Sequence, residues 1–377
     1  MKKTLLISLE YPPQVGGVAN FLSGLAEDLP PEDIAVLSSR SPQSYLFDHE
    51  KKYAVYRRKL VFKNLIFWPK WFPALLNAIA LAKKEKFEHV LVGQVLPLGY
   101  IALILKKIFK TPYSVFVYGM DITIPAKNKW KRKMLLFVLN KAEKIICAGS
   151  FVRDEVVQLG IALEKTLVVY PCAKEESKLE IGNLKVEMIK KYNLEDKKVL
   201  LTVGRLVERK GHDKVIEALP KVLEKMPNII YLIVGDGPNI NNLKSKILNL
   251  KLENAVILAG KVSNQDLQDY YALADVFIMP SRDIDGDVEG FGTVFLEAGR
   301  FGKAVIGGRS GGVPEAVIDG ETGLLVDPVN TDEIAEAIIK LLTNDELRNK
   351  LGQQGKERVE KDFVWTKEAG KIEKLLS

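Results

Sequence analysis

The sequence predicts an α/β protein made of two doubly wound, Rossmann-like domains. Short apolar segments alternate with longer amphipathic segments along the whole chain, which is the pattern of parallel sheets covered by helices on both faces. The chain has 377 residues, more than a single hydrophobic core usually supports. Because 47% of the residues are hydrophobic, the chain can bury two cores.

Six strands are expected in each half, because each of these segments is short, apolar and bounded by turn-forming residues. The first six are Thr4 to Leu9, Ile34 to Ser38, His89 to Val92, Tyr113 to Val117, Lys144 to Cys147 and Thr166 to Val169. The second six are Val199 to Val203, Ile229 to Val234, Ala255 to Leu258, Val276 to Pro280, Ala304 to Gly307 and Gly323 to Val326. The pattern is interrupted between Pro171 and Leu194, so we place the domains at residues 1–171 and 172–362.

The charge is distributed unevenly between these domains. The net charge is +7. Residues 1–171 carry 25 Lys and Arg against 14 Asp and Glu, a net charge of +11, whereas residues 172–377 carry 30 against 34, a net charge of −4. The sequence contains no recognisable nucleic-acid-binding motif, so nucleic acid is not expected as a partner of the basic half.

The cysteine content and the length of the apolar runs indicate where in the cell the protein is located. Cys147 and Cys172 lie in or beside apolar runs and are expected to be reduced core residues in the cytosol. The N-terminal apolar run is too short for a signal peptide, and no run approaches the roughly 18 residues of a spanning helix. We therefore expect a cytoplasmic protein that is soluble or peripheral to a membrane.

The segment from residue 281 to residue 297 contains the strongest functional signal. A turn, Gly290-Phe291-Gly292, follows the predicted strand ending at Pro280, and a helix is expected to begin at or just after Gly292. Such a turn exposes backbone N–H groups at a helix N-terminus, which favours a phosphate. Glu289 and Glu297 would lie on opposite sides of this position, with Glu297 able to accept both hydroxyls of a ribose. The alternative is that both glutamates are ordinary solvated charges.

Three further segments follow predicted strands. Adjacent glycines, Gly16 and Gly17, would allow the backbone to approach a phosphate, although a flexible turn explains them equally. Asp121 follows the strand ending at Val117 and could either contact a ligand or cap the next segment. Arg205 and Lys210 could neutralise a diphosphate without a metal, because a guanidinium and an ammonium are strong phosphate donors.

Together these motifs resemble those of a known enzyme family. Glu289 and Glu297 around Gly290-Phe291-Gly292, followed by Gly311-Gly-Val-Pro-Glu315, resemble the signature of the retaining GT-B glycosyltransferases of family four. The string from Asp287 to Gly292 is similar to that of bacterial phosphatidylinositol mannosyltransferases. The resemblance implies a GT-B fold, in which two Rossmann-like domains face each other across a cleft. It also implies that the first domain binds the acceptor, the second binds the donor, and the C-terminal helix, residues 363–377, packs back on the first domain.

The resemblance also assigns roles to individual residues. It implies a diphosphate clamp of Arg205 and Lys210, in which Arg209 is the less favoured cation, and a loop at Gly16 and Gly17 that closes over the donor diphosphate. Residues expected to contact the donor are Lys261 and Val262 at the base, with Gly290, Phe291, Gly292, Glu289 and Glu297. Asp121 would touch the transferred sugar. Tyr118 departs from the histidine found in many relatives, so no catalytic role is assigned to it.

Metals and other cofactors are not expected. The three histidines, His49, His89 and His212, are far apart in sequence and form no ligand motif with the cysteines. Residues 283–287 lack the glycine and glutamate positions of a calcium loop and are interpreted as a loop against the sugar or solvent.

The expected function is therefore retaining transfer of a hexose from a nucleotide sugar to an acceptor hydroxyl. The resemblance favours GDP-mannose as donor and a lipid or lipid-linked glycan as acceptor; UDP-glucose or UDP-N-acetylglucosamine remain alternative donors. A nucleotide-sugar 2-epimerase and a sugar-nucleotide-binding module are the competing classes. Basic residues interleaved with aromatic ones predict docking of the first domain on an anionic membrane surface, and they lie at residues 56–63, 67–72 and 127–134.

Overall fold

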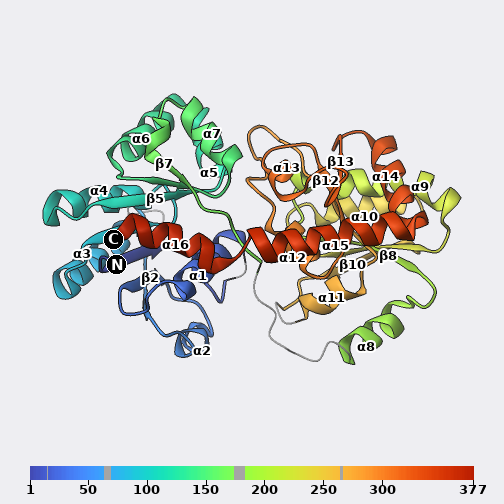
Figure 1. Cartoon of the computed structure of the whole chain (residues 1–377), viewed down its shortest axis with the longest axis horizontal. Coiled ribbons are helices and arrows are strands. Elements are labelled where there is room, and N and C mark those ends of the chain that lie inside the picture. Colours follow the sequence, from blue (N-terminus) through green and yellow to red (C-terminus); the bar gives the residue numbers. More distant parts are fainter. Residues whose placement is uncertain (15, 63–68, 174–182, 264–265) are drawn as a thin grey trace. The chain divides into compact units, whose positions relative to one another are not determined.

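The computed structural model describes residues 1–14, 16–62, 69–173, 183–263 and 266–377. The chain divides into two compact units, called here the first unit (residues 1–172 with 364–377) and the second unit (residues 173–363). Each unit contains one parallel sheet with helices packed against it (Figure 1).

The described residues of the first unit form a seven-stranded parallel sheet in the order β3-β2-β1-β4-β5-β6-β7. Its strands are β1 (Thr4–Ser8), β2 (Ile34–Ser39), β3 (Ala54–Arg58), β4 (His89–Val92), β5 (Tyr113–Val117), β6 (Ile145–Cys147) and β7 (Thr166–Val168). Its helices are α1 (Gly17–Asp28), α2 (Ser44–His49), α3 (Phe72–Glu85), α4 (Leu98–Phe109), α5 (Met120–Ala126), α6 (Lys129–Lys141), α7 (Ser150–Gln158), the 3-10 turn η1 (Leu163–Lys165) and α16 (Trp365–Leu376).

The second unit contains a six-stranded parallel sheet in the order β10-β9-β8-β11-β12-β13. Its strands are β8 (Lys198–Val203), β9 (Ile229–Val234), β10 (Val256–Gly260), β11 (Val276–Met279), β12 (Ala304–Gly308) and β13 (Gly323–Val326). Its helices are α8 (Asn183–Tyr192), the 3-10 turn η2 (Glu208–Lys210), α9 (His212–Lys225), α10 (Ile240–Asn249), α11 (Leu267–Leu273), α12 (Thr293–Arg300), α13 (Val313–Ala316), α14 (Thr331–Thr343) and α15 (Asp345–Asp362).

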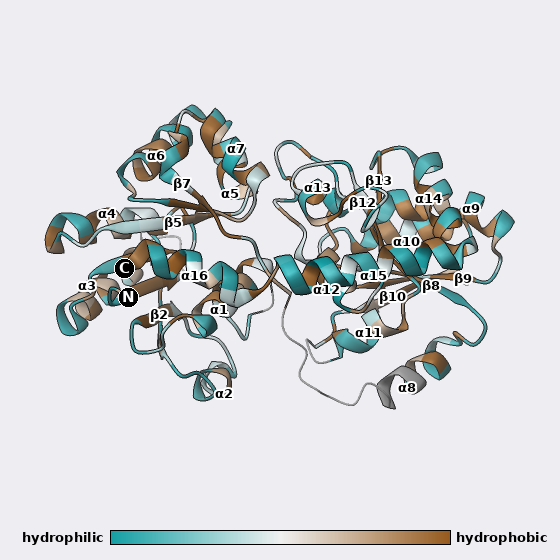
Figure 2. Cartoon of the chain, in the orientation of Figure 1, coloured by the Kyte–Doolittle hydropathy of each residue, from teal (hydrophilic) through white to brown (hydrophobic). Residues whose placement is uncertain are grey.

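All twelve predicted strands are present, with ends within two residues of the prediction. The prediction of six strands in the first half is wrong by one, because β3 was missed. This strand lies at the edge of its sheet and pairs with β2 alone. Arg58 is exposed and the buried Arg57 is paired with Asp48, so two arginines stand where the central strands have an apolar run. Figure 2 shows the strands mainly in hydrophobic colours and the long helix α15 mainly in hydrophilic ones.

Both sheets reverse their strand order at one point. β1 lies beside β4 in the first unit, and β8 lies beside β11 in the second. At such a switch point the loops after two neighbouring strands diverge and leave a crevice at the carboxyl ends of the strands. The loops that follow β8 and β11 contain the strongest sequence motifs.

Helix α16 packs on α1 within the first unit. Trp365 lies against Phe21, with ring centroids 5.9 Å apart, and fills the space above Gly24. The Lys2 N–H donates to the Leu376 carbonyl at 2.8 Å, and the Tyr170 N–H donates to the buried Glu368 carboxylate at 2.7 Å. No helix in the described part of the chain is both long and apolar enough to cross a membrane.

Two alanine substitutions test this packing. Gly24→Ala should lower the free energy of unfolding by about 1–3 kcal/mol through overpacking, because a Cβ there would lie 2.4 Å from two ring carbons of Trp365. Gly370→Ala in α16 is the matched control. No atom lies within 4 Å of its added Cβ, so it should raise stability by about 0.5–1 kcal/mol through helix propensity. Chemical denaturation measures both, and equal effects would contradict the contact between α16 and α1.

Candidate functional site

Two loops of the second unit touch at the switch point between β8 and β11. One contains residues 204–211 and the other residues 280–292. Gly211 permits the contact, because it has a φ of +76° and a Cβ there would lie 2.2 Å from the Pro280 carbonyl oxygen. The Arg282 N–H donates to the Arg209 carbonyl at 2.8 Å, which joins the two backbones directly.

Glu289 is the charged centre of these loops. Its Oε2 accepts from Lys210 Nζ and from Arg209 Nη1, the latter at 2.6 Å. The three side chains are nearly buried, with 13% of Glu289, 10% of Lys210 and 16% of Arg209 exposed. The structure therefore brings together two of the predicted site residues, Lys210 and Glu289, and adds Arg209.

The two cations keep Glu289 ionised. Burial alone would raise the pKa of Glu289, but the charges of Lys210 and Arg209 outweigh burial and lower the pKa to about 2. At neutral pH the carboxylate is therefore a fixed negative charge that can accept hydrogen bonds.

Asp287 completes this cluster. Its Oδ1 lies 2.8 Å from Arg209 Nε, so the Arg209 guanidinium bridges Asp287 and Glu289. Residues 283–287 were expected to form a loop against the sugar or solvent; Asp287 is 32% exposed and in addition pairs with Arg209. Arg209 and its two carboxylate partners are about eighty positions apart in the chain and meet because β8 and β11 are neighbours in the sheet.

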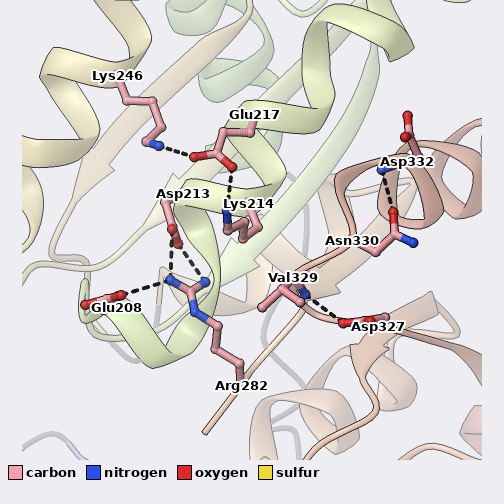
Figure 3. Close-up of polar contacts among 10 residues, drawn as sticks. All are labelled: Glu208, Asp213, Lys214, Glu217, Lys246, Arg282, Asp327, Val329, Asn330 and Asp332. Carbon is pink, nitrogen blue, oxygen red and sulfur yellow. Dashed lines mark hydrogen bonds and ion pairs between the residues drawn. The ribbon is translucent and has the colours of Figure 1, made fainter. Parts of the chain in front are cut away.

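A second, buried ion pair joins Arg282 to Asp213 beside the same two loops. Arg282 Nη1 and Nη2 donate to the two carboxylate oxygens of Asp213 at 3.0 and 2.9 Å, and Nη2 also reaches Glu208 at 3.4 Å (Figure 3). Asp213 lies in the first turn of α9, directly after the loop that carries Lys210. Because Arg282 lies in the loop after β11 and Asp213 directly follows the loop after β8, the pair links the two loops. Removing one partner would leave an uncompensated buried charge.

The glycines at 311 and 312 allow a third loop to pack on Glu289. The Gly312 N–H donates to the Glu289 carbonyl at 2.9 Å, and a Cβ at Gly312 would lie 2.0 Å from the Gly290 carbonyl oxygen. A Cβ at Gly311, where φ is +56°, would lie 2.4 Å from the Glu289 carbonyl oxygen. The two glycine motifs noted in the sequence are therefore in direct contact.

Helix α12 begins after this contact. Gly292 is its N-cap with a φ of +93°, and no side chain caps the helix there. The buried ring of Phe291 meets Phe363 edge to face, with centroids 5.5 Å apart. Glu297 is half-buried and accepts from the buried Tyr271 hydroxyl at 2.6 Å, so Glu289 and Glu297 have different polar partners.

The remaining predicted donor residues lie on the rim of the second unit. Arg205 follows β8 and is exposed, and its guanidinium makes no ion pair or hydrogen bond within the described residues. Lys261 is exposed and Val262 half-buried, and both follow β10. These residues stay predictions for the donor.

The predicted residues of the first unit lie at the carboxyl ends of β1 and β5. A Cβ at Gly17 would have no described atom within 4 Å, and a Cβ at Gly16 would meet only Glu10 Oε2 at 3.9 Å. The packing of the described residues therefore does not require glycine at these positions.

The Asp121 carboxylate is buried in the first turn of α5. Its Oδ1 accepts from the Tyr118 N–H at 2.8 Å, whereas its Oδ2 and the Tyr118 hydroxyl are closed to solvent and have no partner in the described part of the chain. Burial raises the pKa of Asp121 to about 6, despite the opposing backbone hydrogen bonds. The Tyr118 ring packs edge to face on Phe21 at 5.9 Å.

Comparison with known proteins gives this geometry a family. Residues 15–176 match the model of Glycosyltransferase Family 4, and residues 185–358 match that of Glycosyl transferases group 1. The chain is a GT-B glycosyltransferase similar to family 4.

Relatives match this glycosyltransferase over nearly its whole length. It is 28% identical to a GDP-mannose-dependent monoacylated alpha-(1-6)-phosphatidylinositol monomannoside mannosyltransferase of Corynebacterium glutamicum, over 97% of this chain and 95% of the relative. It is 26% identical to the GDP-mannose-dependent alpha-(1-6)-phosphatidylinositol monomannoside mannosyltransferase of Mycolicibacterium smegmatis, over 99% and 98%.

Solved structures show the same fold. HepE of Anabaena in complex with UDP-glucose aligns with a TM-score of 0.82 and 20% identity, over 100% of this chain and 99% of that one. The sucrose-phosphate synthase of Thermosynechococcus elongatus aligns with a TM-score of 0.82 and 22% identity, over 100% and 98%.

Sequence reasoning ranked Arg209 below Lys210 and did not assign Asp287, Arg282 or Tyr271 to this glycosyltransferase site. The signal for Arg209, Asp287 and Arg282 was weak but present, since charged residues immediately after two buried strands meet if those strands are neighbours. Tyr271 lies on α11 and carried no such signal. Among the described residues, no group of three or more His, Cys, Asp or Glu side chains could hold a metal ion.

Proposed function

We propose that this glycosyltransferase moves a hexose, with retention and without a metal, from a nucleotide sugar to an acceptor hydroxyl of a lipid or lipid-linked glycan. The observation that carries the proposal is the pairing of Lys210 and Arg209 with Glu289 at the switch point. A buried carboxylate beside a lysine suits a sugar diphosphate, because the carboxylate accepts from sugar hydroxyls and Lys210 can meet the phosphates.

The chemistry follows from the charge that develops on the diphosphate. The anomeric carbon–oxygen bond breaks and the diphosphate departs, while the acceptor oxygen bonds to the same face of the sugar and passes its proton to a departing phosphate oxygen. Arg205, Lys210 and the N–H groups at the start of α12 would stabilise that charge. Glu289 would hold the sugar hydroxyls, Asp121 of the first unit would touch the transferred sugar, and no side chain need act as a nucleophile.

The remaining donor contacts follow the same scheme. Glu297 would accept the ribose hydroxyls, the backbone of Lys261 and Val262 would meet the base, and Gly16 and Gly17 would close over the diphosphate. GDP-mannose is favoured because the two relatives described above are named as GDP-mannose-dependent. UDP-glucose or UDP-N-acetylglucosamine is the alternative, and 2-epimerisation of a nucleotide sugar is the competing reaction.

A donor panel tests the proposal. GDP-mannose should raise the melting temperature more than UDP-glucose or UDP-N-acetylglucosamine, because a ligand that binds only the folded state stabilises it by mass action. Product analysis should then give free nucleotide and an α-mannosylated acceptor, since retention keeps the configuration of the donor. An isomeric nucleotide sugar would indicate epimerisation, and a β-linked product would contradict retention.

The clamp predicts a large loss of turnover without any metal requirement. Arg205→Ala or Lys210→Ala should each lower kcat by about 10²–10³-fold, because each removes a preorganised donor to the developing charge. EDTA should leave wild-type kcat unchanged. Loss of activity in EDTA with rescue by magnesium or manganese would contradict the metal-free clamp, and steady-state kinetics with the donor identified above measures both effects.

The proposed acceptor is supported by an exposed basic and aromatic face on the first unit. Trp130 and Phe137 of α6 are 68% and 53% exposed and lie seven residues apart, on one face of the helix. Met120 and Ile124 of the adjoining helix α5 are also exposed. The cations beside them are Lys127, Lys129, Lys131, Arg132 and Lys133. Of the other predicted docking residues, 63, 67 and 68 lie outside the described part of the chain.

Docking of this face is expected on a membrane that contains anionic lipid. Each engaged cation contributes about 1 kcal/mol near such a surface, so Lys129→Glu/Lys131→Glu/Lys133→Glu should abolish sedimentation with anionic liposomes at low salt. The matched control Lys225→Glu/Lys244→Glu/Lys340→Glu makes the same charge change on exposed lysines of the second unit and should still sediment. Indifference of the wild-type chain to lipid charge, with full activity on a soluble sugar acceptor, would contradict the proposal.

A further inference from the structure

Lys210 and Arg209 share one carboxylate oxygen, but the two cations are held differently. Lys210 Nζ has Glu289 as its one ion-pair partner within the described residues, whereas the Arg209 guanidinium also contacts Asp287. The Arg209 carbonyl accepts from the Arg282 N–H, and Arg282 is itself held by two hydrogen bonds to Asp213. Lys210 thus has a single ion pair to exchange for a phosphate, while Arg209 is held by two carboxylates and through its backbone carbonyl.

This difference has a consequence when a diphosphate binds. If Lys210 turns to a phosphate, Glu289 loses one of its two cations. The Glu289 side chain is only 13% exposed, so water cannot replace that cation fully. A buried carboxylate without a cation takes up a proton, because burial penalises its ionised form. Protonated Glu289 would accept sugar hydroxyls poorly.

We propose that Arg209 is a positioning residue that stays with Glu289 when Lys210 turns to the donor diphosphate, so that the carboxylate remains ionised and oriented toward the sugar. This inference rests on the proposed function, and it gives Asp287 the task of holding the Arg209 guanidinium.

The surroundings of Glu289 contain few other charges. Arg209 and Lys210 face it from the loop after β8, and Asp287 lies beside it in its own loop. The third loop presents the backbone of Gly311 and Gly312, which carries no titratable group. In a complex in which Lys210 contacts the donor diphosphate, the titration of Glu289 thus depends mainly on Arg209.

The test compares the pH dependence of kcat with nucleotide affinity in the full-length chain. Arg209→Met should move the acid limb of kcat above pH 4.5, the ordinary glutamate pKa, because burial penalises the ionised carboxyl. A limb at about pH 6 would raise the ratio of kcat at pH 8 to kcat at pH 5 about tenfold over wild type. The kcat ratio of Arg209→Lys should lie between those of wild type and Arg209→Met. An ammonium keeps the positive charge but lacks the planar fork with which a guanidinium contacts two carboxylates. Asp287→Asn should move the acid limb of kcat in the same direction as Arg209→Met, but by a smaller amount.

Affinity for GDP and UDP, measured by calorimetry, should change by less than about twofold in Arg209→Met, since the inference keeps Arg209 on Glu289 and Asp287 and not on a phosphate. The control is Arg348→Met, which removes an equally shielded arginine, 12% exposed, from its pair with Asp345. The control should keep the wild-type pH profile. Carbon-13 NMR of the nucleotide complex, with Glu289→Gln to assign the signal, follows the Glu289 carboxyl without requiring turnover.

The outcomes separate the inference from the proposed function. Loss of nucleotide affinity in proportion to kcat would place Arg209 on the diphosphate and overturn the inference, as would a Glu289 titration in Arg209→Met that matches wild type and Arg348→Met. If the wild-type chain transfers sugar from no donor, the proposed function fails, while the NMR comparison still decides the role of Arg209.

Discussion

The second unit depends on one constraint, which is that the buried carboxylate of Glu289 must be neutralised by cations from a different loop. A carboxylate removed from water is stable only if it is paired and hydrogen-bonded, so Lys210 and Arg209 must lie at fixed positions beside it. The backbones accordingly approach each other at Gly211 and Gly312, where any Cβ would collide with a carbonyl oxygen. The cations are thus placed by the protein's own charges before any ligand arrives, which is the preorganisation that electrostatic catalysis requires.

Much of the fold followed from the sequence, because its determinants are local. Central strands such as Ile229–Val234 are buried on both faces, so each appears as a short apolar run. The edge strand Ala54–Arg58 could not be found in this way, since one of its edges and much of its surface face water. What marks that strand is its register against β2, a long-range pairing that a single sequence does not reveal.

The site was predictable to the level of loops but not of contacts. Glu289 and Lys210 were singled out by motif, and their proximity follows from the adjacency of β8 and β11. Arg209 was ranked below Lys210 as a site cation. Its pairing with Asp287 and Glu289 depends on how the chain turns between Ser281 and Glu289, which the sequence does not reveal. Asp121 illustrates a different limit. Its carboxylate accepts from the Tyr118 N–H, which precedes the N-cap Gly119 of α5, so it does not cap the helix as one interpretation expected, and its contact with a sugar stays a prediction.

The first unit is assembled from both ends of the chain, since α16 covers Gly24 on α1. During synthesis all of the second unit emerges from the ribosome before residues 364–377 do, and domains generally fold as their residues become available. The surface of α1 that receives Trp365 must therefore stay uncovered while an entire second domain is translated. Completion of the first unit thus waits for the last residues of the second although its strands are made first, and the α1 surface under Trp365 stays open for that time.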